Sequence, residues 1–203
     1  LCQIRDARTG AVTLAFPYDG DLPDRVEGRF VYSVRGEGGG LFVLEPPQKT
    51  PHRLLDVGHW VRAVAEGVAV IDTYDDDNRF GRLIAVDLAS GAVLWEDAGG
   101  PNFALAVDGG ELAAAVAVDE KRLAMTLRDL RTGRVRWTAE PVVAEDVTPL
   151  IAADCVLGSV FGERIEIYDR ASGRRVQTLD EESSLVKGGC LDAAGLIDVA
   201  ARV

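Results

Sequence analysis

Two stretches of ten residues follow nearly the same pattern: VDLASGAVLW at residues 86–95 and RDLRTGRVRW at residues 128–137. Both place an Asp, a Ser-Gly or Thr-Gly pair and a Trp at the same spacing. The Asp carboxylate can accept hydrogen bonds from the backbone N–H groups of the next few residues, as in an Asx-turn. The Gly can adopt the positive φ that closes a hairpin loop. Each stretch is therefore predicted to be a β-hairpin with a short apolar strand on either side of the turn.

The Asp-x-x-Ser/Thr-Gly pattern occurs four times. Its copies run from Asp6 to Gly10, Asp87 to Gly91, Asp129 to Gly133 and Asp169 to Gly173. The last three Asp positions are 42 and 40 residues apart, whereas the first step of 81 residues is about twice as long. A degenerate fifth copy is therefore predicted at about residues 45–52, where prolines replace the Asp and Gly signals. Trp95 and Trp137, four residues after their glycines, are predicted to pack between neighbouring units.

Two further strand-like runs precede each hairpin, such as FALAVDG and ELAAAVAVD before Asp129. Four strands in about 40 residues are typical of a β-propeller blade. No stretch shows a helical period of apolar residues. The predicted fold is all-β, a single β-propeller domain over residues 1–203 built from four-stranded antiparallel blades.

The two ends of the chain each contain half of a four-stranded repeat, and the two halves are complementary. Residues 2–16 have the pattern of a third and fourth strand, while SLVKGG (184–189) and GLIDVAARV (195–203) have that of a first and second strand. Strands from both termini would complete one blade and remove exposed sheet edges. We therefore expect five blades closed by both termini, with a fragment of a seven- or eight-bladed propeller as the alternative.

Composition narrows the classes of partner. The net charge of −11 and the absence of long Lys/Arg runs exclude the basic patch expected of a nucleic-acid-binding protein. No apolar run approaches the ~18 residues needed to cross a bilayer, so no membrane insertion by this segment is expected. Cys2, Cys155 and Cys190 permit at most one disulfide, and we favour the interpretation that all three are small buried hydrophobic residues.

The hairpins resemble the pyrroloquinoline-quinone (PQQ)-like β-propeller repeats, whose pattern is a strand followed by Asp-x-x-Thr-Gly-x-x-x-Trp, and more broadly WD40-like repeats. The full pattern is present at Asp87–Trp95 and Asp129–Trp137, and the copies at Asp6 and Asp169 lack the Trp. The resemblance implies one of two functions: an eight-bladed dehydrogenase that holds PQQ and calcium, or a non-catalytic bacterial scaffold such as an outer-membrane assembly lipoprotein. This chain has no adjacent Cys pair and is less than half the length that such a dehydrogenase needs. It therefore looks closer to the scaffolds.

One acidic stretch is a candidate metal site. DTYDDDNRFG at residues 72–81 offers the carboxylates of Asp72, Asp75 and Asp77, which are hard oxygen ligands suited to Ca²⁺. The spacing is not that of an EF-hand, and we favour a solvated hairpin tip. Trp60, the one Trp outside the hairpins, is expected either to pack between blades or to anchor a partner.

The function expected from the sequence is a non-catalytic scaffold for protein interaction or ligand sensing. It would hold a protein or a small ligand on a propeller face. We expect it outside the cytoplasm, in the periplasm, at the cell surface or secreted, either alone or as part of a membrane-anchored protein. No catalytic residue and no cofactor other than the candidate calcium are predicted. The alternatives are a PQQ- and calcium-dependent oxidoreductase or its degenerate relative, and a propeller that binds a small ligand or a glycan.

Overall fold

In a computed structural model of the chain, the described residues are 2–5, 8–16, 24–26, 28–34, 39–45, 48, 50–56, 60–75, 78–98, 104–119, 121–144, 146–160 and 163–180. These residues form strands, turns and connections, without a helix. The all-β fold predicted from the repeat is therefore confirmed.

The strands form five antiparallel sheets in chain order. Sheet 1 is the hairpin of β1 (Cys2–Arg5) and β2 (Val12–Phe16). Sheet 2 contains β3 (Asp24–Val26), β4 (Arg29–Val34), β5 (Gly40–Leu44) and β6 (His52–Leu55). Sheet 3 contains β7 (Trp60–Ala65), β8 (Val68–Asp75), β9 (Asn78–Asp87) and β10 (Val93–Ala98).

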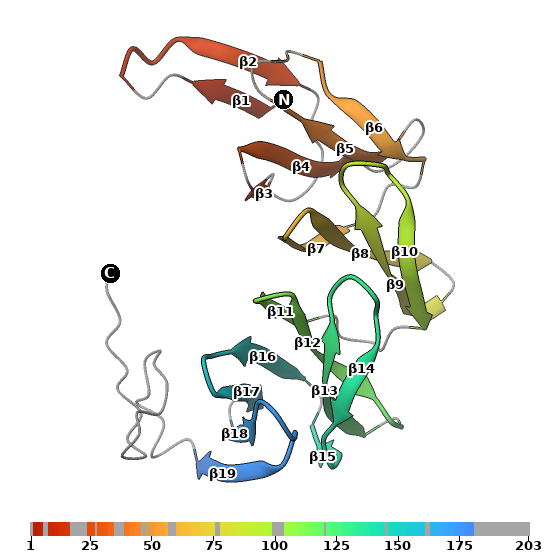
Figure 1. Cartoon of the computed structure of the whole chain (residues 1–203), viewed down its shortest axis with the longest axis vertical. Helices are drawn as coiled ribbons and strands as arrows, with labels where there is room; N and C mark the ends of the chain where they lie inside the picture. The colour runs from red at the N-terminus through yellow and green to blue at the C-terminus, as the bar shows by residue number, and fades with distance from the viewer. Residues whose placement is uncertain are drawn as a thin grey trace.

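Sheet 4 contains β11 (Leu105–Asp108), β12 (Glu111–Ala117), β13 (Arg122–Asp129) and β14 (Val135–Thr138), with β15 (Val142–Val143) paired to β13. Sheet 5 contains β16 (Val147–Ile151), β17 (Cys155–Val160), β18 (Arg164–Asp169) and β19 (Arg175–Asp180). The sheets follow one another along an arc (Figure 1), and the first strand β11 contacts the first strands of both neighbouring sheets, β7 and β16. This is the arrangement of blades in a β-propeller.

The predicted hairpins are the third and fourth strands of their sheets. In sheet 3, for example, β9 and β10 pair with a register shift between Val93 and Trp95. The same irregularity recurs between β13 and β14 and between β18 and β19. The degenerate copy near residues 45–52 connects β5 and β6, which also pair. The hairpin is therefore kept at the repeat copy that lacks the Asp and Gly signals.

Sheet 4 departs from the expected four strands. After β14 the backbone N–H of Ala139 still donates to the carbonyl of Met125, and β15 then pairs with the beginning of β13. Pro141 lies between these two contacts and has no N–H to donate. The outer strand is therefore interrupted at Pro141 and resumes as β15.

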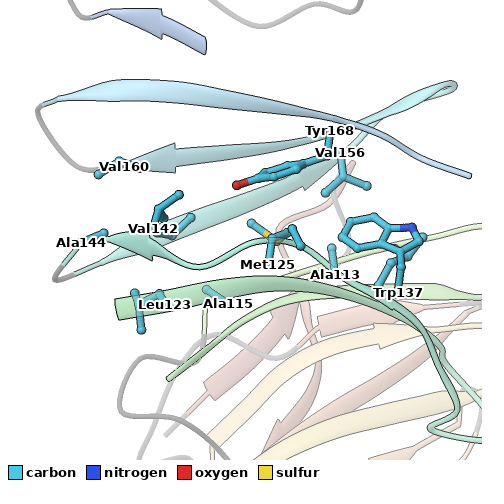
Figure 2. Packing of buried hydrophobic residues seen from close by; sticks show 13 residues of the cluster. Ala113, Ala115, Leu123, Met125, Trp137, Val142, Ala144, Val156, Val160 and Tyr168 are labelled. Carbon is cyan, nitrogen blue, oxygen red and sulfur yellow. The ribbon is translucent and has the colours of Figure 1, made fainter. Parts of the chain in front are cut away.

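The core lies between consecutive sheets, because both faces of each inner sheet carry apolar side chains. Val31 of sheet 2 packs in one cluster with Ile71 of sheet 3, and Val70 of sheet 3 packs in another with Leu112 of sheet 4. The largest cluster joins sheets 4 and 5 (Figure 2); its labelled members are Ala113, Ala115, Leu123, Met125, Trp137, Val142, Ala144, Val156, Val160 and Tyr168. Sheets 3 and 4 are thus each packed against both of their neighbours.

The strands predicted to close the ring, residues 184–189 and 195–203, lie outside the described residues. Asp6 and Cys190 lie outside them as well. The five-blade closure, the fragment alternative and the single domain over residues 1–203 therefore stay predictions.

Candidate functional site

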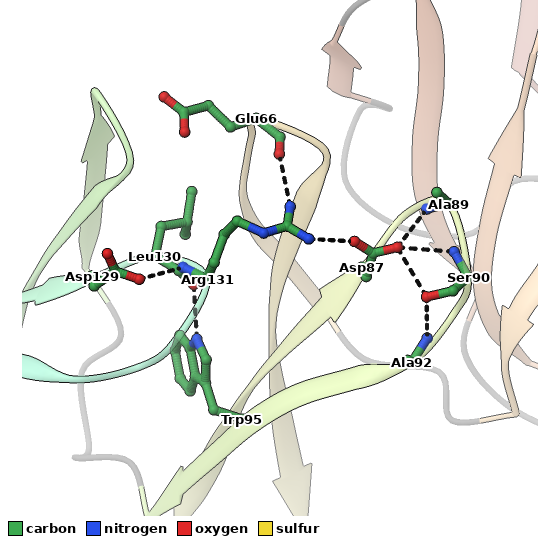
Figure 3. A network of polar contacts seen from close by, with 9 residues as sticks. All are labelled: Glu66, Asp87, Ala89, Ser90, Ala92, Trp95, Asp129, Leu130 and Arg131. Carbon is green, nitrogen blue, oxygen red and sulfur yellow. Dashed lines mark hydrogen bonds and ion pairs between the residues drawn. The ribbon is translucent and has the colours of Figure 1, made fainter.

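The Asp-x-x-Ser/Thr-Gly turns share one hydrogen-bonding arrangement. The Oδ1 atom of Asp87 accepts from the N–H groups of Ala89 at 3.1 Å and Ser90 at 2.9 Å, and from the Ser90 hydroxyl at 2.9 Å (Figure 3). The N–H of Gly91 donates to the carbonyl of Asp87, and φ of Gly91 is 71°. This positive φ favours glycine, because a side chain there would crowd its own backbone. One carboxylate oxygen thus holds the whole turn together.

The copies at Asp129 and Asp169 have the same geometry. Oδ1 of Asp129 accepts from the backbone and hydroxyl of Thr132, and Oδ1 of Asp169 accepts likewise from Ser172. The positive φ angles recur at the glycines, which are Gly10, Gly91, Gly133 and Gly173. The backbone hydrogen bond from Thr132 lowers the pKa of Asp129 below its usual value, and the hydrogen bond from the Ser172 hydroxyl lowers that of Asp169. Both carboxylates are therefore ionised near neutral pH.

Each Trp of the pattern covers the turn of the next sheet. The indole N–H of Trp95 donates to the carbonyl of Leu130 at 2.8 Å. A Cβ added to Gly133 would lie only 2.6 Å from the nearest carbon of the Trp95 ring. Trp137 repeats this on sheet 5, with its N–H on the carbonyl of Arg170 at 2.8 Å and a hypothetical Cβ on Gly173 only 2.5 Å away. These glycines are thus required both by their φ and by the ring that covers them.

An arginine joins the turns of sheets 3 and 4. Arg131 donates to Oδ2 of Asp87 at 2.7 Å and to the carbonyl of Glu66 at 3.4 Å (Figure 3). The hydrogen bond from Arg131 and then those from Ser90 lower the pKa of Asp87 to about 2. Asp87 therefore binds its own turn with one oxygen and the next sheet with the other.

A buried carboxylate joins sheets 4 and 5. Glu111, 5% exposed, pairs with Arg136 of its own sheet and with Nε of Arg170 at 2.6 Å from sheet 5. Arg170 also donates to the carbonyl of Ala152 at 2.7 Å and pairs with Asp108 at 3.0 Å. Burial opposes the charge of Arg170, but the bonds to Glu111 and Asp108 dominate and raise its pKa. We call the side of the molecule that carries all these turns the turn face.

The candidate calcium ligands are only partly described. Asp72 lies in β8 with no exposed surface, and its Oδ2 accepts from Nε of Arg62 at 2.6 Å. The guanidinium of Arg62 in turn lies 5.1 Å from the ring centre of Trp60. Asp75 is the last residue of β8, and Asp77 lies outside the described residues. A calcium ion at Asp72 would have to displace Arg62 from that oxygen.

The part of the chain that the structure describes contains no group of three or more His, Cys, Asp or Glu residues placed to hold a metal ion. It also contains no helix of the length and hydropathy needed to cross a membrane. Cys155 is buried, 4% exposed, at the start of β17.

The inter-sheet charges were not found from the sequence. Arg131 follows its turn Asp by two residues, a position also filled by Arg8, so a comparison of the copies could have singled it out. Glu111 and Arg62 carry no such signal, since their partners come from other strands.

The comparisons with known proteins agree with this geometry. The family model of outer membrane protein assembly factor BamB matches residues 7–200. No curated protein gives a significant match. Among solved structures, BamB from Moraxella catarrhalis has a TM-score of 0.54 at 20% identity, over 88% of this chain and 51% of that one.

Two eukaryotic proteins are similarly close in fold. The β-propeller domain of Myceliophteria thermophila Cps50 (Swd1) has a TM-score of 0.53 at 13% identity, over 87% of this chain and 66% of that one. Sqt1 from Saccharomyces cerevisiae has a TM-score of 0.58 at 13% identity, over 88% of this chain and 55% of that one.

This chain thus spans about half the length of the BamB structure, at 51%. At these identities the solved structures establish the propeller fold alone. The family match covers nearly the whole chain and includes the turn motifs from Asp87 onward. The chain therefore belongs to the family of outer membrane protein assembly factor BamB, built from PQQ-like propeller repeats.

Proposed function

We propose that this protein is a non-catalytic β-propeller scaffold that holds a partner protein on one of its faces, outside the cytoplasm. The observation that carries the proposal is that the polar groups of the turn face are engaged in hydrogen bonds and ion pairs with the protein itself. The turn aspartates, Arg131, Glu111 and Arg170 bind turns and neighbouring sheets. Their role is to fix the sheets relative to one another, which gives a rigid platform for exposed residues.

Rigid platforms with variable exposed residues are a common basis for binding, because loops and strand ends held by a scaffold lose little freedom when a partner docks. The family is named for a factor in the assembly of outer membrane proteins, which supports a role in holding another protein and a place outside the cytoplasm. The acidic net charge of −11 is compatible with a protein partner and unfavourable for nucleic acid.

The interaction is tested by site-specific photo-crosslinking in cells that make the full natural protein. A benzophenone amino acid would replace one exposed residue at a time: Arg134 on the turn face, Glu140 between β14 and β15 near the opposite ends of the strands, and Gln177 on the outer strand β19. We expect a discrete adduct from one face and none from the others. Equal diffuse labelling at all three positions, or none at any of them, would contradict a docked partner.

The oxidoreductase alternative is tested on the purified protein by a thermal-shift titration with PQQ, with Ca²⁺ and with EDTA. The scaffold proposal predicts no change in melting temperature with either ligand. A saturable rise that requires both PQQ and Ca²⁺ would overturn it. Labelling of intact cells with a membrane-impermeant amine reagent tests the location, and protection of the exposed Lys121 would contradict a place outside the cytoplasm.

A further inference from the structure

Sheet 4 carries an addition that the other described four-stranded sheets lack. The short strand β15 pairs with β13 through Arg122 and Val143, beside the β12–β13 turn. That turn lies at the opposite end of the strands from the turn face, because consecutive strands are antiparallel. Additions of this kind in repeat proteins map to loops on one face, which is often the binding face.

The two residues of β15 have opposite environments. Val142 is 7% exposed and packs into the cluster between sheets 4 and 5 (Figure 2), whereas Val143 is 66% exposed. On the other side of Arg122 lies Val118, which is 49% exposed and whose N–H donates to the carbonyl of Arg122. Paired residues of adjacent strands share one face of a sheet. Val118, Arg122 and Val143 therefore form a row with an apolar side chain at each end.

An open hollow of about 460 Å³ lies along this row, lined by Asp119, Lys121, Arg122 and Val143. Its volume falls in the range of ligand-sized pockets. The backbone around it is held firmly: the N–H of Lys121 donates to Asp119, and the N–H of Ala144 donates to the carbonyl of Lys121. The hollow is therefore a fixed feature of the sheet edge.

The charges of the hollow favour an acidic partner. Arg122 donates to Oδ2 of Asp119 at 2.7 Å, so these two side chains largely neutralise each other. Lys121 is exposed, and no described carboxylate forms an ion pair with it. The hollow thus combines an exposed apolar end at Val143 with one cation, in a chain whose overall charge is −11.

We propose that this hollow, lined by Lys121, Arg122 and Val143 beside Val118, binds a short segment of a partner protein that presents an aliphatic or aromatic side chain next to a carboxylate. The apolar side chain covers Val143 and the carboxylate pairs with Lys121. The proposal rests on the scaffold function proposed above and names the chemistry of the partner and the face it uses.

The test uses blocked dipeptides as probes, followed by amide chemical shifts of the isotope-labelled protein. Acetyl-Leu-Glu-amide is expected to produce saturable shifts at Val118, Lys121 and Val143 at millimolar concentrations. Acetyl-Leu-Gln-amide and acetyl-Leu-Lys-amide are the matched probes, and each is expected to bind at least threefold more weakly. Equal shifts from all three dipeptides, or no saturable shift at these residues, would overturn the proposal.

Variants of Lys121 and Val143 test the ionic and the apolar contact separately. Lys121→Glu is expected to reverse the order of the probes, so that the lysine dipeptide binds more tightly than the glutamate dipeptide. Val143→Ser is expected to weaken both at least threefold. Val93→Ser is the matched control, because Val93 is a 50% exposed valine on β10, away from the hollow. An equal effect of the two serine variants would contradict a site at Val143.

The photo-crosslinking experiment distinguishes the failure of this inference from that of the scaffold function. An adduct from Glu140 alone supports both, since this position leaves Lys121 and Val143 in place. An adduct from Arg134 alone keeps the scaffold function and overturns the site at the hollow. No adduct from any position overturns the scaffold function, whatever the dipeptides show.

Discussion

Because the ring of Trp137 lies against Gly173, we expect a methyl group added at Gly173 to lower the stability of the protein strongly, by an amount that can be separated from the effect on the backbone alone. In Gly173→Ala the new Cβ lies at a φ of 70° and only 2.5–2.7 Å from three ring atoms of Trp137. The left-handed backbone costs about 1–2 kcal/mol for a residue with a side chain. Crowding a well-packed interior adds roughly 1–3 kcal/mol. We therefore expect Gly173→Ala to lower the free energy of unfolding by roughly 2–5 kcal/mol.

Gly67→Ala is the matched control. Gly67 closes the β7–β8 turn at a φ of 71°, and a Cβ there would meet no atom within 4 Å. This substitution carries the backbone cost without the crowding, so it should lower the free energy of unfolding by about 1–2 kcal/mol. Denaturant titrations followed by circular dichroism measure both changes. If the two alanine variants agree within ~0.5 kcal/mol, Trp137 does not press on Gly173 as argued.

A double-mutant cycle isolates the Trp ring. In a Trp137→Leu background the methyl group of Gly173→Ala loses most of its crowding, so its effect should fall toward that of Gly67→Ala. The expected coupling between the two positions is about 1–3 kcal/mol. Additive effects would refute the claim that the ring of one sheet requires glycine in the turn of the next.

Three further effects are expected from the turn face. Arg131→Leu should raise the pKa of Asp87 from about 2 toward its ordinary 3.8, because the hydrogen bond from Arg131 is the largest cause of the lowered pKa. An unchanged NMR titration of the Asp87 carboxyl carbon would refute the effect of Arg131 on this pKa. The turn aspartates have pKa values below those of the unfolded chain, so they contribute to stability above about pH 4, and this contribution is lost as the pH falls toward 2. Acid unfolding curves that show no loss of stability in this range would contradict this role of the aspartates. Trp95→Phe keeps a ring over the next turn but leaves the carbonyl of Leu130 without its donor. This should lower the free energy of unfolding by about 1–2 kcal/mol. A stability equal to that of the parent protein would argue against this hydrogen bond.

The turn motif was predictable because its interactions are local. Asp87 binds atoms two and three residues further along the chain, and this short range leaves a fixed spacing in the sequence. The period of about 40 residues and the apolar runs likewise indicated strands and their order, and the family match supports that interpretation.

Other features depended on residues far apart in the chain. Arg131 reaches Asp87 across 44 positions, and Arg170 reaches Glu111 across 59. Position in the repeat could not show that Asp72, predicted among the calcium candidates, is buried against Arg62. The same holds for Val143, which differs from Val142 only in the face of the strand that it occupies.

The sequence by itself therefore determined the repeat unit, the hairpin turns and the all-β class, since each arises from hydrogen bonds and apolar alternation within a few residues. Only the tertiary structure decided which charges join neighbouring sheets, where Trp137 covers Gly173, and which valines remain exposed. Those features depend on the distance between sheets and the register of their strands, which are set by side-chain packing between segments about 40 residues apart.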